Sequence, residues 1–206
     1  MSSETKMFAG VMGVTLALIV GVAVLLSNKS TPKPVDEASL VNQNSQVLGA
    51  ADAKVTVVEF SDFECPACKA AQPALDEVLT IYKDRVRFVY RNFPLPTHVN
   101  SWPAAQAAES AGLQGKFWEK HKVLFEKSPE LGKDLLFGYA KDLGLNMDKF
   151  ARDYDSDAVR ERILNDINDG NSVGVKATPT FFINGTKFEG ALSVAEFSRE
   201  IDSRLK

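Results

Sequence analysis

Two cysteines, the only ones in the chain, frame the tetrapeptide Cys65-Pro66-Ala67-Cys68. The run just before them, Val55–Ser61, is apolar and β-branched, which is typical of a buried strand. Pro66 suits the first position of a helix, because its φ is already helical and its missing N–H would have no partner there. The pattern therefore predicts a strand, a short turn, and a helix that starts beside Cys65 and runs to about Tyr82.

This placement gives the two thiols different chemistry. Backbone N–H groups and the dipole at a helix N-terminus stabilise a thiolate, so Cys65 is predicted to be the attacking thiol. Cys68 lies one turn further in and is predicted to resolve the mixed disulfide. The close spacing lets a disulfide open and close with little backbone movement. Two alternatives stay open: a static disulfide, which would close too small a loop to stabilise much, and half of a metal site shared with another chain.

Glu59 is the one charged residue inside the predicted strand. Burying a carboxylate among apolar side chains is costly, so we expect its pKa to rise. A carboxyl with a raised pKa beneath the cysteine pair can accept the proton of the Cys68 thiol or return it to the Cys68 thiolate. The alternative is that Glu59 occupies an exposed position of the strand.

A second block of strands is predicted near the C-terminus. Thr178-Pro179-Thr180 opens an apolar run, and a proline at the start of a strand sometimes carries a cis bond. Asn184-Gly185 predicts a hairpin, and Ser193 is a typical N-cap for a last amphipathic helix. Between the two blocks, about residues 97–172 have the composition and spacing of helices. The order predicts an α/β fold with a helical insertion.

The N-terminal part of the chain has a different composition. Residues 7–26 form an uncharged apolar run of about 20 residues, enough to span a bilayer as a helix. We interpret residues 1–27 as a single N-terminal transmembrane anchor, 28–48 as a flexible linker and 49–206 as the folded domain. A cleaved signal peptide is the alternative for the anchor. Lysines flank the run on both sides, and their count leans weakly against export of the domain.

Composition excludes some classes of function. The formal net charge is −3 and no basic stripe stands out, which argues against nucleic acid as the main partner. The chain has 2 Cys and 2 His. A Cys-ligated iron–sulfur cluster needs about four ligands, and a Cys/His zinc site would use all the cysteines and histidines there are. We therefore predict no metal.

Several of these segments resemble a known family. VTVVEFSDFECPAC at residues 55–68 and TPTFFING at residues 178–185 are similar to the thioredoxin superfamily. QGKFWEKH at residues 114–121, followed by Leu124 and Phe125, is similar to the helical insertion of its DsbA-type thiol:disulfide oxidoreductases. The resemblance covers about residues 49–205 and implies a thioredoxin-like α/β fold with an inserted helical domain.

The resemblance also implies roles at the site. Cys65 is the implied nucleophile, Cys68 the resolving thiol, and Glu59 the buried carboxyl below them. Pro179 is implied to be cis and to face the cysteine pair. The backbone of Thr178 would then pair with an extended substrate peptide, strand to strand.

Other residues follow from the same likeness. Phe63, Pro66 and Ala67 are expected to line the substrate groove, whereas His98 and His121 are assigned to packing. Ala67 departs from strongly oxidising members, which carry His at this position. An imidazolium there stabilises the thiolate and so favours the reduced form. Because Ala67 stands in place of that His, the redox potential and the direction of electron flow stay open.

The activity implied is that of an extracytoplasmic thiol:disulfide oxidoreductase, with oxidation as its main direction. Its partners would be reduced or unfolded exported proteins and a membrane-embedded redox partner of DsbB or VKOR type. Disulfide exchange belongs in an oxidising compartment, so we expect a single-pass membrane protein with its domain in the periplasm or on the outer surface. We expect a monomer with no cofactor besides the redox-active cysteine pair. The alternatives are a reductase, a disulfide isomerase, and a non-catalytic peptide-binding chaperone.

Overall fold

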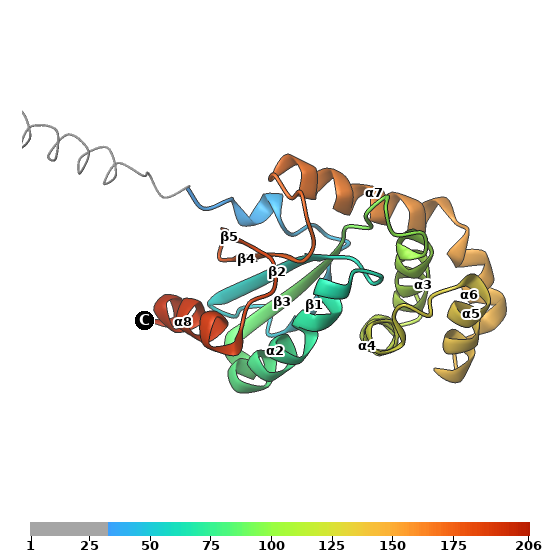
Figure 1. Cartoon of the computed structure of the whole chain (residues 1–206), viewed down its shortest axis with the longest axis horizontal. Coiled ribbons are helices and arrows are strands. Elements are labelled where there is room, and N and C mark those ends of the chain that lie inside the picture. Colours follow the sequence, from blue (N-terminus) through green and yellow to red (C-terminus); the bar gives the residue numbers. More distant parts are fainter. Residues whose placement is uncertain (1–32) are drawn as a thin grey trace, which may run out of the picture. The chain divides into compact units, whose positions relative to one another are not determined.

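The computed structural model describes residues 33–206, so the predicted anchor lies outside it. Within this described part, no helix is long and apolar enough to cross a membrane. A mixed sheet in the order β1–β3–β2–β4–β5 forms the centre of the domain (Figure 1). Its strands are β1 (Gln46–Gly49), β2 (Val55–Ser61), β3 (Val86–Asn92), β4 (Thr180–Ile183) and β5 (Thr186–Glu189). β2 and β3 are parallel, whereas the other neighbours are antiparallel.

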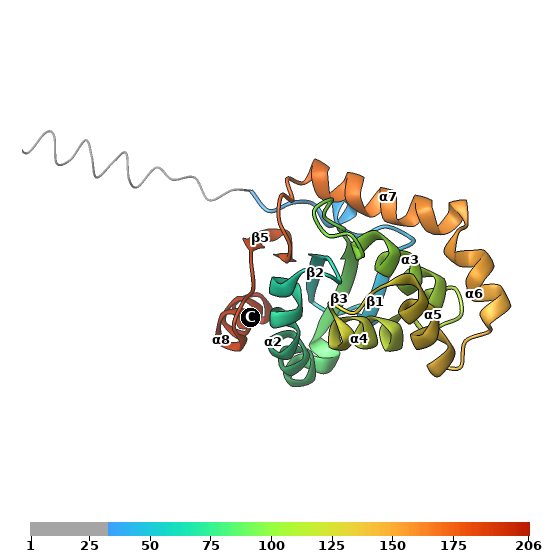
Figure 2. The same cartoon turned by 45° about the vertical axis from the view of Figure 1, so that its right-hand side comes forward.

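Helices cover both faces of the sheet (Figure 2). α2 (Pro66–Tyr82) and α8 (Val194–Leu205) pack on one face, and the end of α7 (Asp157–Ser172) packs near the other with the 3-10 helix η1 (Glu37–Ser39). The chain between β3 and β4 forms α3 (Ser101–Gly112), α4 (Phe117–Lys127), α5 (Lys133–Asp142), α6 (Met147–Tyr154) and α7. A second 3-10 turn, η2 (Lys83–Arg85), links α2 to β3. The predicted α/β arrangement with a helical insertion is confirmed.

Local signals at the C-terminal end behave as predicted. Asn184 and Gly185 have φ of 44° and 79°, and they join β4 to β5 as a hairpin. Ser193 and Glu196 form a reciprocal capping box at the start of α8. These short-range patterns set the local structure because their hydrogen bonds are made within a few residues.

The segment before β1 corrects one prediction. Residues 34–48 were expected to belong to a flexible linker, but they are part of the folded domain. Leu40 is 1% exposed and packs with Val58 and Phe182, and β1 pairs antiparallel with β3. The prediction was wrong because strands and helices are recognised by a periodic pattern of apolar residues. In this polar stretch the apolar residues are isolated, and each packs on the domain without such a pattern.

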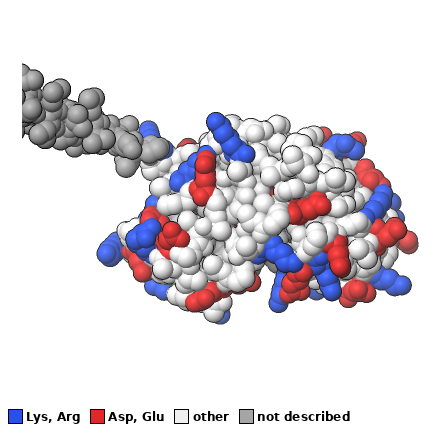
Figure 3. All heavy atoms as spheres, in the orientation of Figure 1, with Lys and Arg blue, Asp and Glu red and all other residues white. Residues whose placement is uncertain are grey.

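A buried ion network ties the insertion to the sheet. Arg91 of β3 is fully buried, and its guanidinium contacts Asp166 and Asp169 of α7, each at 2.5 Å. The same guanidinium donates to the carbonyl of Leu40. One cation therefore holds the sheet, α7 and the N-terminal segment together. On the surface, Figure 3 shows basic and acidic side chains interspersed on the face in view.

Gly185 gives a first testable prediction. Its φ is positive, and a Cβ there would meet the backbone of Val35, whose N–H donates to the carbonyl of Gly185 at 2.8 Å. We expect Gly185→Ala to lower the free energy of unfolding by about 2–3 kcal/mol. Gly190 is the matched control, because its φ is also positive but nothing lies within 4 Å of the added Cβ. Gly190→Ala should cost about 1 kcal/mol, and equal losses in urea unfolding would show that the Val35 contact is unimportant.

Candidate active site

The two cysteines lie at the start of α2, where β2 ends. Cys65 is the N-cap and is 6% exposed, whereas Cys68 is fully buried; both are free thiols. In its protonated form, the Sγ atom of Cys65 donates to the carbonyl oxygen of Thr178 at 3.4 Å. Pro66 and Ala67 are exposed beside Cys65. Cys65 is therefore the more accessible of the two sulfurs, and Cys68 lies inside the helix.

The surroundings separate the two thiols in acidity. The hydrogen bond from the thiol of Cys68 lowers the pKa of Cys65 to about 5, with help from Thr178 and the N–H groups of Cys68 and Ala67, although burial works against it. Burial raises the pKa of Cys68 strongly, and the neighbouring charge of Glu59 adds to this. At neutral pH Cys65 is a thiolate and Cys68 a thiol, which agrees with the thiolate predicted at the N-terminus of the helix.

This acidity can be measured directly. The rate of Cys65 alkylation by iodoacetamide should follow a titration with its midpoint near pH 5, because the thiolate is the reacting form. Cys68→Ala removes the largest cause of the low pKa and should move the midpoint upward. A wild-type midpoint near that of an ordinary thiol, about 8.5, would contradict the geometry.

Glu59 lies beneath the cysteine pair. Side chains alternate along β2, so Glu59 shares with Val55 and Val57 the face that packs under α2. It is fully buried, and neither carboxylate oxygen has a hydrogen-bonding partner within the described residues. Burial raises its pKa to about 7. The carboxyl is thus poised to change its protonation state near neutral pH, beside a thiol that must lose or gain a proton.

Asp62 holds the turn between β2 and α2, a role that the sequence analysis missed. Its carboxylate accepts from the N–H of Glu64 at 2.8 Å and of Leu95 at 2.9 Å, and it contacts Nδ1 of His98 at 2.8 Å. Burial disfavours the charged imidazolium of His98, but the hydrogen bond and charge of Asp62 outweigh it and raise the pKa of His98. His98 therefore braces this turn rather than merely packing.

Phe63 corrects the expected substrate groove. Its side chain is 1% exposed and stacks on Tyr90, with ring centroids 5.1 Å apart. Phe125 and His121 of α4 also contact the ring. The turn directs Phe63 inward under α4, so it supports the floor of the site and does not line a surface groove. His121, also buried among these rings, is a packing residue as predicted.

Thr178 and Pro179 lie directly across from Cys65. The Thr178–Pro179 peptide bond is cis, as the resemblance implied. Thr178 is 7% exposed, and its carbonyl is the group that contacts Cys65. The structure therefore brings Cys65, Cys68, Glu59 and Thr178–Pro179 into one site, as the resemblance implied, although more than 100 residues separate its two halves.

Beyond the cysteines, α2 carries two further polar residues that the sequence analysis did not single out. Gln72 and Asp76 follow Cys68 at intervals of four residues, so all three lie on one face of the helix. The four-residue spacing is visible in the sequence. Its relation to the site could not be predicted, because it depends on the buried position of Glu59 in the folded chain. Among residues 33–206, no group of three or more His, Cys, Asp or Glu side chains is placed to hold a metal ion.

Comparisons with known proteins agree with this geometry. A family model described as thioredoxin matches residues 41–203. A thioredoxin-like oxidoreductase from Silicibacter pomeroyi DSS-3 has a TM-score of 0.75 and 28% identity, with 82% of this chain and 97% of that one covered. Oxidised BdbD from Bacillus subtilis has a TM-score of 0.71 and 27% identity, covering 79% and 94%. The thiol-disulfide exchange protein α-DsbA2 from Wolbachia pipientis, at 20% identity, shares the fold with a TM-score of 0.74, covering 81% and 90%.

Curated relatives carry a different name. The Na(+)/H(+) antiporter NhaA 1 of Salinispora arenicola is 40% identical over 158 residues, which is 76% of this chain but 24% of that protein. NhaA 1 of Mycolicibacterium vanbaalenii is 36% identical over 180 residues, 84% of this chain and 29% of that protein. The chain thus spans only 24% and 29% of the length of these two relatives, and the antiport in their names is not carried over to it.

Proposed function

Since the chain belongs to the thioredoxin family, we propose that it is a thiol:disulfide oxidoreductase that oxidises exported proteins through Cys65 and Cys68. The observation that carries the proposal is the unequal acidity of the two thiols, with the pKa of Cys65 lowered to about 5 and that of Cys68 raised. A stabilised Cys65 thiolate favours the reduced enzyme, and an enzyme with a stable reduced form gives its disulfide away readily.

The proposed cycle balances in thiols and electrons. A substrate thiolate attacks Sγ of Cys65 in the disulfide form, and Cys68 leaves as a thiolate that takes a proton from Glu59. A second thiolate of the same substrate then attacks the substrate sulfur that is bonded to Cys65. The substrate gains a disulfide, and Cys65 leaves as a thiolate. Two electrons now reside in the cysteine pair. They pass to a membrane partner when the Cys65 thiolate attacks that partner's disulfide and Cys68 resolves the product.

Partners and location belong to the same proposal. Residues 1–27 would anchor the chain as a single-pass membrane protein, with the domain in the periplasm or on the outer surface. Its substrates would be reduced or unfolded exported proteins. A partner of DsbB or VKOR type would reoxidise the pair, and the protein would act as a monomer with the cysteine pair as its only redox group. The support is chemical: an oxidising compartment is where a disulfide donor is useful.

The direction of electron flow is tested by the redox potential. We would titrate the Cys65–Cys68 pair of the whole chain against glutathione. A potential above roughly −180 mV, more oxidising than protein disulfide isomerase, is the result expected of an oxidase. A value near about −270 mV would be thioredoxin-like and would replace the proposal with a reductase. Cys65→Ser should abolish disulfide donation to a reduced protein substrate. The chaperone alternative would be favoured if the wild type exchanged no disulfides and both proteins bound unfolded peptide.

The curated relatives suggest a second candidate function, a redox partner of a Na(+)/H(+) antiporter. The supporting observation is that these antiporters contain a stretch 36–40% identical to most of this chain. Proteoliposomes that hold the Salinispora arenicola antiporter would be assayed with the wild-type chain and with Cys65→Ser. An antiport rate that changes with the wild-type chain alone would support this function, and equal rates would reject it.

A further inference from the structure

The reaction needs a way for Glu59 to exchange its proton with water, because its side chain is fully buried. We propose that Gln72 and Asp76 form the proton path between Glu59 and solvent, through the groove between α2 and α4. The inference rests on the proposed function and assigns two positioning residues to it. Neither residue touches the substrate, so both act through Glu59.

The first support is the stripe that these residues form on α2. Cys68, Gln72 and Asp76 recur every four residues and so form a stripe along one side of the helix, at the edge of its buried face. Their exposure rises along the stripe, from buried Cys68 through half-buried Gln72 to exposed Asp76. Nε2 of Gln72 donates to the carbonyl of Cys68 at 3.4 Å, which holds the amide close to the cysteine. The stripe therefore leads from the buried site to the surface.

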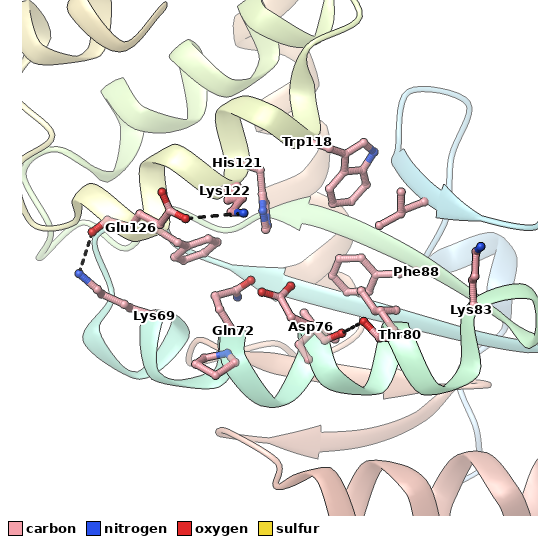
Figure 4. A pocket seen from close by; sticks show the side chains of 15 residues that line it. Lys69, Gln72, Asp76, Thr80, Lys83, Phe88, Trp118, His121, Lys122 and Glu126 are labelled. Carbon is pink, nitrogen blue, oxygen red and sulfur yellow. Dashed lines mark hydrogen bonds and ion pairs between the residues drawn. The ribbon is translucent and has the colours of Figure 1, made fainter. Parts of the chain in front are cut away.

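The second support is the groove itself, which has a volume of about 830 Å³. Figure 4 shows Gln72 and Asp76 projecting from α2 into it, with α4 forming the opposite wall. Leu79, Phe88 and Trp118 form an apolar part of the lining, and Gln72 and Asp76 are among its polar side chains. Water entering the groove would find hydrogen-bonding partners in Gln72 and Asp76.

The third support is that both residues influence the pKa of the Glu59 carboxyl, although neither is hydrogen-bonded to it. Burial dominates the raised pKa of Glu59, Ser61 and Gln72 counteract it, and the charges of Asp76 and Cys65 add to it. Of these four neighbours, Asp76 is the exposed one. Tyr90 of β3 does not offer another path to solvent. Its hydroxyl is fully buried and has no hydrogen-bonding partner in the described residues.

The charged groups around Asp76 suit a proton carrier. From α4, Lys122 and Glu126 face it, and their side chains lie 3.9 Å from each other. Burial raises the pKa of Asp76, the charge of Lys122 opposes this and that of Glu126 adds to it. His121, also on α4, is not a competing carrier, because burial lowers its pKa to about 3 and it stays neutral.

The proton step can be written for the resolution of a mixed disulfide. The thiol of Cys68 gives its proton to the Glu59 carboxylate, and the new thiolate attacks Sγ of Cys65. The partner's sulfur leaves as a thiolate and takes a proton from solvent. Protonated Glu59 then passes its proton, through water positioned by Gln72, to the Asp76 carboxylate and on to the buffer. The reverse order serves the step in which Cys68 leaves.

The test measures two rates in the whole chain. Reduced protein is mixed with oxidised glutathione, quenched with acid and analysed by mass spectrometry, which separates mixed-disulfide formation at Cys65 from resolution by Cys68. In dilute buffer at about pH 6.5, Asp76→Asn should slow resolution about five- to tenfold and leave formation unchanged. Added imidazole, a small proton carrier, should restore the rate, and so should the conservative Asp76→Glu. Lys83→Gln, which lines the same groove, is the matched control and should alter neither rate.

The outcomes separate this inference from the function on which it rests. Resolution at the wild-type rate in both Asp76→Asn and Gln72→Met would overturn the path. A slower resolution that does not respond to imidazole at any pH would also overturn it, since a merely structural defect is insensitive to buffer. If the wild-type protein forms no mixed disulfide at Cys65 at all, the proposed function itself fails.

Discussion

Replacing Glu59 with Gln should slow every step that moves a proton on Cys68, by about 100-fold at pH 7, because a positioned acid–base group contributes factors of this order. The amide has nearly the same shape, so the cysteines keep their places at the start of α2. Attack by Cys65 should be unaffected, since its thiolate forms without Glu59 when the pKa is about 5. The measurement is the same pair of rates, formation and resolution of the glutathione mixed disulfide.

The same substitution should stabilise the fold at alkaline pH. Burial raises the pKa of Glu59 to about 7 from the ordinary 4.5, so the native state holds a proton that the unfolded chain has released. The stability contributed by the protonated form is fully present below about pH 4.5 and is lost as the pH rises through 7. At pH 8 we expect Glu59→Gln to be more stable than the wild type by about 2–3 kcal/mol, falling below about 1 kcal/mol at pH 5.

A control separates burial from charge removal alone. Glu77 lies on α2 and is exposed, so Glu77→Gln should leave the pH dependence of urea unfolding unchanged. Parallel curves for Glu59→Gln and the wild type between pH 5 and 8 would mean that Glu59 does not titrate across this range. A normal rate of resolution would remove it from the mechanism, whatever its effect on stability.

The parts of the site that the sequence predicted are those that short-range patterns specify. Cys65 as N-cap and Cys68 one turn inside follow from the spacing and from Pro66. Glu59 was recognised because a carboxyl in an apolar strand is chemically out of place. The Asn184-Gly185 hairpin follows from residues that tolerate positive φ.

The residues that were missed depend on contacts between distant segments. Asp62 holds its turn through contacts of its carboxylate with Leu95 and His98, which follow β3 in the chain. No local sequence pattern around Asp62 predicts these two contacts. Phe63 was expected in the substrate groove on the resemblance alone, but its contacts with Tyr90 of β3 and Phe125 of α4 turn its ring inward. The folded segment before β1 was missed for the same reason, as its apolar residues find partners only in the assembled sheet.

Lys120 is a buried charge that the proposed reaction does not use, and replacing it with Met should stabilise the protein at low pH. Its side chain is fully buried between α4 and α5, where Nζ donates to the carbonyl of Leu136 at 2.6 Å. Nζ also lies 5.5 Å and 5.6 Å from the ring centroids of Tyr139 and Phe150. Burial lowers the pKa of Lys120 to about 7, although Asp142 opposes this in part. The unfolded chain thus binds a proton that the native state has released between pH 7 and about 10.5.

This difference in bound protons sets the direction in which the stability changes with pH. A lysine whose pKa is lowered on folding costs most stability below pH 7, and the cost shrinks as the pH rises toward 10.5. At pH 6 the cost approaches about 4–5 kcal/mol, partly offset by the hydrogen bond to Leu136 and the two rings. We expect Lys120→Met to exceed the wild type by about 2–4 kcal/mol at pH 6, and this advantage to shrink by about 2–3 kcal/mol by pH 9.

The pH dependence distinguishes a buried amine from simple repacking. If Met only filled the space better than Lys, its advantage over the wild type would be the same at pH 6 and pH 9. Lys127 ends the same helix and is exposed, so Lys127→Met should change stability little at either pH. A constant advantage for Lys120→Met would show that Lys120 reaches solvent through the helical insertion. An advantage that fades with pH would show instead that α4, α5 and α6 close over a lysine that is neutral in much of the native population at physiological pH.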